Sequence, residues 1–68
     1  MLHLVTGMMF GFIASVTTVD GETFLLNEQY QTQSQCIEET VSLVMDLEND
    51  NEVKNVNVIM ACEELTEE

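Results

Sequence analysis

An Asp-Gly pair between two apolar runs is the feature of this sequence that most restricts its fold. Residues 8–19 are rich in β-branched and aromatic side chains, and residues 23–26 resume the apolar run after Asp20 and Gly21. A type I′ turn needs positive φ at both central residues, which Asp and Gly accept more readily than most. The sequence therefore predicts a β-hairpin with a long first strand and a turn at Asp20-Gly21.

The apolar stretch of residues 1–19 has two other interpretations. Its apolar run 8–16 and the small pair Ala14-Ser15 fit a secretion signal processed near Ala14–Val16, but no Lys or Arg precedes them. A membrane span needs ~20 apolar residues, and this stretch is shorter and interrupted by Gly and Thr. We expect a structural strand and no membrane span, with a small secreted domain as the minority alternative.

A helix is predicted over residues 34–48. Apolar side chains recur at positions 36/37, 40/41, 44 and 47, the spacing of one helix face. Its N-cap is either Ser34, or Thr32 with Gln35 in a capping box. The polar segment 49–51 should end the helix.

Residues 55–62 then read as a strand, which completes the order β-β-α-β in a single domain, residues 1–68. The expected class is α+β, with one helix packed on a small, three-stranded, mainly antiparallel sheet. A chain of 68 residues has little left to cover the second sheet face. An uncovered apolar face indicates a partner surface, which we assign to Phe10, Phe12, Phe24, Leu25 and Ile59.

The two cysteines, Cys36 and Cys62, allow one intramolecular pairing. A 15-residue helix is ~22 Å long, and an eight-residue strand returns ~26 Å, so both cysteines should lie at the same end of the fold. A disulfide there is the favoured interpretation. The alternative is two buried free thiols in a reducing compartment.

The pattern of strand, turn, strand, cysteine-opened helix and final strand resembles a loose group of small two-cysteine phage-encoded proteins of unassigned function. The matching residues are Thr23–Leu26, Cys36 and the segment Met60-Ala61-Cys62, within residues 8–62. The acidic loop and tail depart from that group. The resemblance implies a viral origin, in a virion or in host cytoplasm, and implies no activity.

Composition argues against several classes of function. One Lys and no Arg against 13 acidic residues give a net charge of −12, so direct nucleic-acid binding is not expected. His3 near the chain start is poorly placed for catalysis, and with Cys36 and Cys62 it makes only three zinc-ligand candidates. The acidic segment 46–57 fails as a calcium loop, because Asn51 and Asn57 occupy the positions of the required Gly and Glu. We expect no enzyme activity, cofactor or metal.

The remaining signal is the acidic surface predicted on the helix and the loop after it: Glu38, Glu39, Asp46, Glu48, Asp50 and Glu52. Together with the uncovered sheet face, it predicts a protein-interaction module that forms a homo-oligomer or larger assembly. The first hypothesis is an accessory structural subunit of a viral particle, decorating a capsid or associated with a tail. The alternative is an acidic inhibitor or DNA mimic that binds a basic host protein.

Overall fold

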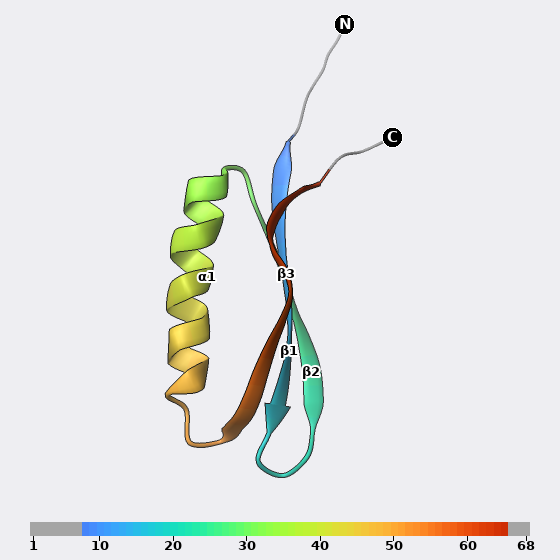
Figure 1. The fold of residues 1–68 in the computed structure, drawn as a ribbon, viewed down its shortest axis with the longest axis vertical. Coiled ribbons are helices and arrows are strands. Elements are labelled where there is room, and N and C mark those ends of the chain that lie inside the picture. Colours follow the sequence, from blue (N-terminus) through green and yellow to red (C-terminus); the bar gives the residue numbers. More distant parts are fainter. Residues whose placement is uncertain (1–7, 66–68) are drawn as a thin grey trace, which may run out of the picture.

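The computed structural model describes residues 8–65 and confirms the order β-β-α-β (Figure 1). Its elements are β1 (Met9–Thr18), β2 (Thr23–Tyr30), α1 (Gln33–Glu48) and β3 (Val53–Leu65). The strands form one antiparallel sheet in the order β2-β1-β3. Because β2 and β3 both run antiparallel to β1, they are parallel to each other, and α1 is the connection between them.

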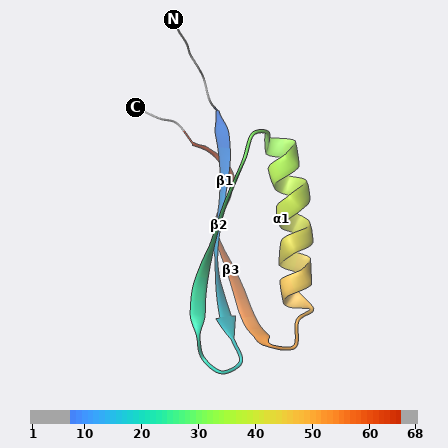
Figure 2. The same ribbon diagram turned by 180° about the vertical axis from the view of Figure 1, so that it is seen from behind.

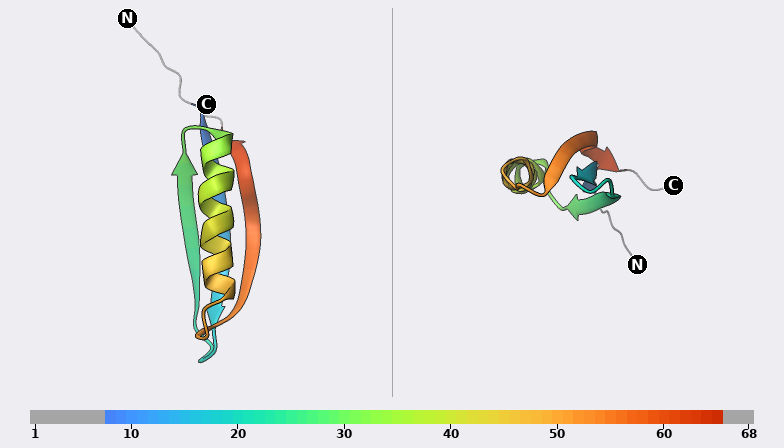
Figure 3. Two further views of the ribbon diagram at one scale, coloured as in Figure 1. Left: turned by 90° about the vertical axis from the view of Figure 1, so that its left-hand side faces the viewer. Right: turned by 90° about the horizontal axis from the view of Figure 1, so that it is seen from below.

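The single helix of the described chain covers one face of this sheet (Figure 3). Seen from behind, the three strands lie together on one side of α1 (Figure 2). The central strand β1 supplies Phe12, Ala14 and Val16 to the buried core at alternate positions. This period of two places their side chains on the helix side of the pleat. Cleavage near Ala14–Val16 would cut β1 in its middle, so this fold requires that segment intact.

The hairpin forms where it was predicted, but its turn differs. The Thr18 amide donates to the Glu22 carbonyl (2.8 Å), and the Gly21 amide donates to the Thr18 carbonyl (3.0 Å). Among described residues, Gly21 (φ 93°) and Cys62 have positive φ, and Asp20 does not. The loop is therefore Val19-Asp20-Gly21, a three-residue connection that needs left-handed backbone only at its last position.

The ends of α1 follow local side-chain chemistry. The Thr32 hydroxyl accepts a hydrogen bond from the Gln35 amide (3.1 Å), so Thr32 is the N-cap and Ser34 lies inside the first turn. Such a cap satisfies one of the unpaired amides of the first turn. The helix ends at Asn49, as predicted.

Strand β3 is longer than the predicted 55–62 and carries three irregularities in its pairing with β1. Lys54, Ile59 and Cys62 are each an extra residue between two paired neighbours. A bulge bends a strand and redirects side chains locally. Cys62 has a φ of +57°, and its side chain forms the disulfide with Cys36 of α1.

Candidate docking groove between α1 and β3

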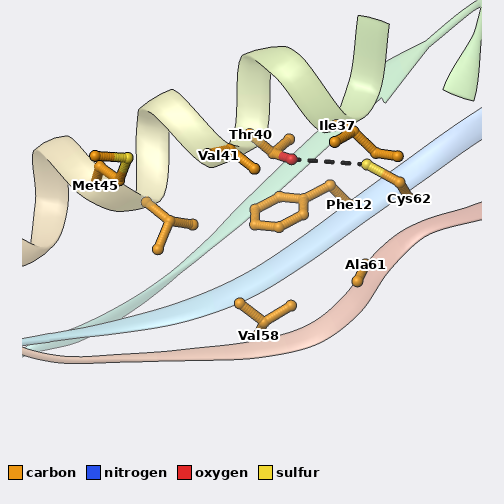
Figure 4. A pocket seen from close by; sticks show the side chains of 9 residues that line it. Phe12, Ile37, Thr40, Val41, Met45, Val58, Ala61 and Cys62 are labelled. Atoms are coloured by element: carbon orange, nitrogen blue, oxygen red, sulfur yellow. Dashed lines mark hydrogen bonds between the residues drawn. The ribbon is translucent and has the colours of Figure 1, made fainter. Parts of the chain in front are cut away.

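An apolar groove of about 300 Å³ lies between one flank of α1 and the helix-facing side of β3 (Figure 4). Ile37, Val41 and Met45 stand four residues apart and therefore line one flank of the helix. Val58 and Ala61 form the opposite wall on β3, and Phe12 lies between them.

The walls of the groove remain accessible. The exposed fractions are 48% for Ile37, 52% for Val41, 56% for Met45 and 43% for Val58. Their floor is buried, since Phe12 is only 3% exposed. Covering these half-exposed apolar side chains with another apolar surface would remove them from water, which is favourable in free energy.

The polar atoms at the end of the groove already have partners. The Thr40 hydroxyl donates to the Cys36 carbonyl (2.7 Å) and lies 3.7 Å from Cys62 Sγ. Cys62 is joined to Cys36 in a disulfide, with a Cα–Cα separation of 5.8 Å. Among the nine lining residues there is no charged side chain. The groove therefore favours contact by shape and apolar area over proton transfer or ion binding.

The five residues predicted to form an uncovered sheet face do not share one surface. Cross-strand pairing puts Phe10, Phe12 and Phe24 on the helix side of the sheet. Phe12 is buried in the core and Phe10 packs against it, which corrects the expectation that both belong to an open face. Leu25 pairs with Ser15 on the other face, and Ile59 is an exposed bulge residue.

The physical reason for this correction is parity along the strands. Directly opposed residues in a sheet point to the same side, so the pairing Phe12–Glu28 and Val16–Phe24 brings the even-numbered residues of β1 and β2 under the helix. The other face carries Ser15 and Asn27 beside Leu25, and is mixed in polarity. The apolar groove between α1 and β3 is instead on the helix side of the sheet.

The predicted acidic residues are all exposed, but they separate into two groups. Glu39 acts electrostatically on Tyr30 of β2, and Asp46, seven residues later, shares that flank of α1. Glu48 lies beside the start of β3, next to the loop with Asp50 and Glu52. Along most of its length α1 thus has Glu39 and Asp46 on the flank towards β2 and apolar side chains on the flank towards β3, with Glu48 as the carboxylate on the β3 side of its last turn. Glu38 is exposed between these flanks.

The pKa of Tyr30 depends on the carboxylates close to it on β2 and α1. Burial raises the pKa of its phenol, and the charges of Glu28 and Glu39 raise it further. The folded-state pKa of Tyr30 thus lies above its unfolded value near 10. The contribution of the neutral phenol to folding stability is therefore complete below about pH 10 and is lost as pH rises through the folded-state pKa.

We expect the tyrosinate absorbance of Tyr30 to develop at higher pH in the folded chain than in urea. The chain has one Tyr and no Trp, so the signal has one source. Glu28→Gln should move the folded midpoint downward, whereas Glu22→Gln, a carboxylate outside this group, should leave it unchanged. Identical folded and unfolded midpoints would contradict the assignment.

Other classes of site have less support in residues 8–65. No three His, Cys, Asp or Glu side chains in this range are arranged to hold a metal ion. His3, the third candidate zinc ligand, lies outside the described residues. No helix in the same range has the length and apolar character to cross a membrane.

Comparison with known proteins identifies no relative: no family model, no curated protein and no solved structure matches the chain. The groove and the distribution of charge are therefore the features from which a function can be inferred.

The helix flank of the groove was missed from the sequence, although a signal for it was present. The periodicity places positions 36/37, 40/41, 44 and 47 together on one helix face and does not separate the buried residues from the exposed ones. Cys36 and Thr40 are buried, but their neighbours Ile37 and Val41 are half exposed. The adjacent pairs 36/37 and 40/41 make the apolar stripe wider than packing on one sheet requires. This extra width is the sequence signal for a second apolar contact.

Proposed function

We propose that this chain is a non-enzymatic protein-interaction module that docks through the α1–β3 groove. The observation that carries the proposal is the row of half-exposed Ile37, Val41 and Met45 facing Val58 across a closed floor. Monomeric proteins rarely leave such apolar surfaces contiguous without a use for them.

The energy of docking sets a condition on the partner. Completing the burial of these four half-exposed side chains would contribute roughly 3–6 kcal/mol. Association costs about 4–15 kcal/mol in lost translational and rotational freedom. The groove alone therefore gives weak binding, and a stable complex needs contacts beyond it, as in an assembly with many repeated interfaces.

The narrower form of the proposal is an accessory structural subunit of a viral particle. Its support is the combination of an apolar flank and an acidic flank on one helix. In that role the flank towards β3 is covered, and the carboxylates towards β2 remain in water and favour solubility.

Groove docking is tested by matched substitutions on α1. Val41→Asp should abolish capture of a groove-dependent partner from source material, because it buries a carboxylate in an apolar contact. Ser42→Asp, on the next exposed position, should leave capture intact. Binding through apolar contact should persist at high salt.

The acidic-inhibitor alternative predicts the opposite pattern. A basic nucleic-acid-binding protein recovered equally by both variants, and lost at high salt, would replace docking by charge complementarity. Melting curves of the two variants show whether each remains folded, as expected for substitutions at exposed positions.

A further inference from the structure

We propose that the occupant of the groove is a second copy of this chain, packed antiparallel and edge to edge along β3 across a two-fold axis. The inference rests on the proposed docking function and names its partner. Two-fold dimers are the commonest closed assemblies, and each copy then offers the same surface to the other.

The first argument is the position of β3 in the sheet. The order β2-β1-β3 leaves the outer edge of β3 without a strand partner within residues 8–65. Exposed strand edges present unused amides and carbonyls that favour pairing. Val58 and Ile59 stand half exposed on this strand, directly beside the groove. A second copy at this edge would therefore cover both the strand and the groove. The added contact along β3 is the one that a stable complex needs beyond the groove.

The second argument is charge complementarity along β3. Lys54, the only Lys or Arg of the chain, lies near the start of the strand. Glu63 and Glu64 lie near its other end. In an antiparallel arrangement Lys54 of one copy meets these acids of its partner, and the symmetry makes the contact twice.

The same register places apolar residues at the centre of the interface. The residue midway between Lys54 and Glu64 is Ile59, and the midpoint with Glu63 falls between Val58 and Ile59. An apolar centre with charged groups at the rim is the usual anatomy of protein interfaces.

The opposite edge of the sheet is a poorer choice for a two-fold contact. There the neighbouring flank of α1 carries Glu39 and Asp46, and β2 carries Glu28. A symmetric copy would bring these carboxylates near their own equivalents, and like charges in proximity destabilise an interface.

Sedimentation equilibrium of the full oxidised chain tests the inference. We expect a monomer–dimer equilibrium that strengthens with added salt, because each copy carries a net charge of −12 and salt screens the repulsion. Ile59→Asp should weaken dimerisation on the order of 100-fold, since it places two carboxylates beside the axis. The matched control Leu25→Asp, also at an exposed apolar position but on β2, should not change the dissociation constant.

Charge exchange tests the antiparallel register. Lys54→Glu should weaken the dimer by roughly 3–10-fold, the scale of two exposed ion pairs. Glu63→Lys with Glu64→Lys in the same chain should restore it. A Lys54→Glu effect that the reversed acids do not rescue would overturn the register.

Three outcomes would overturn the second copy as occupant. One is a wild-type chain that stays monomeric at all concentrations and salt levels. Another is a dimer that Leu25→Asp disrupts and Ile59→Asp does not. A third is a monomer in which deletion of residues 1–7 increases binding of an apolar dye, which would assign the groove to the chain's own N-terminal segment. If the first outcome occurs while Val41→Asp still abolishes capture of another protein, the proposed docking function stands without this partner.

Discussion

Reduction of the Cys36–Cys62 disulfide is expected to lower the free energy of unfolding by about 3–4 kcal/mol. The bond joins residues 26 positions apart and ties the first turn of α1 to the end of β3. Its main effect is on the unfolded chain, whose conformational freedom it restricts. Because a domain of this length has a net stability of roughly 3–10 kcal/mol, the loss removes a large share of it.

Urea unfolding of the oxidised and reduced chain measures this effect on one sequence. The Cys36→Ala/Cys62→Ala variant is the matched control, and reductant should not change its unfolding curve. Titration of free thiols in the folded oxidised chain should detect none at these two positions. Coincident oxidised and reduced curves would show that the bond does not stabilise the fold.

Replacement of Phe12 by alanine should cost about 3–5 kcal/mol, the range for removing a buried aromatic side chain. Phe12 lies in the central strand and is packed in the same cluster as Ala14, Cys36 and Cys62. It also forms the floor of the groove, so its loss opens a cavity between α1 and β3. The variant is expected to lose a large share of its stability even with the disulfide intact.

Phe24→Ala provides the matched control, because the same atoms are removed from a residue that is 46% exposed. Its cost should be about 1 kcal/mol, measured by the same urea titration. Phe12→Leu should fold with a loss of about 1–2 kcal/mol, which keeps the comparison measurable if the alanine variant does not fold. Equal losses for Phe12→Ala and Phe24→Ala would show that Phe12 is not the centre of the core.

Local signals predicted the elements well. The Asp-Gly pair located the hairpin, and Thr32 was one of the two predicted N-caps and is the one that the structure uses. The disulfide followed from element lengths, because a helix and a returning strand of similar reach bring their outer ends together. Each of these inferences depends on residues close in sequence or on simple distances along the chain.

The candidate site was predicted less well, as its apolar residues show. The sequence indicated an uncovered apolar surface but assigned it to a sheet face that includes Phe10 and Phe12. Both sets of alternate residues in this part of β1 are largely apolar, since Gly11 and Ile13 flank Phe12, so the pattern does not say which side the helix covers. Ile37 and Val41 belong to the same apolar stripe as the buried Cys36 and Thr40. The sequence does not show which residues of that stripe are buried, because this depends on how the helix is rotated over the sheet.

By itself the sequence determined the α+β class, the hairpin and the end of α1, and it favoured the pairing of the two cysteines over free thiols, because turn chemistry, helix termination and periodicity are local. Only the tertiary structure decided which strand parity is buried, how α1 is rotated over the sheet, and where the bulges at Ile59 and Cys62 interrupt β3. These depend on packing between segments far apart in the chain. The groove and the separation of acidic and apolar flanks follow from that packing.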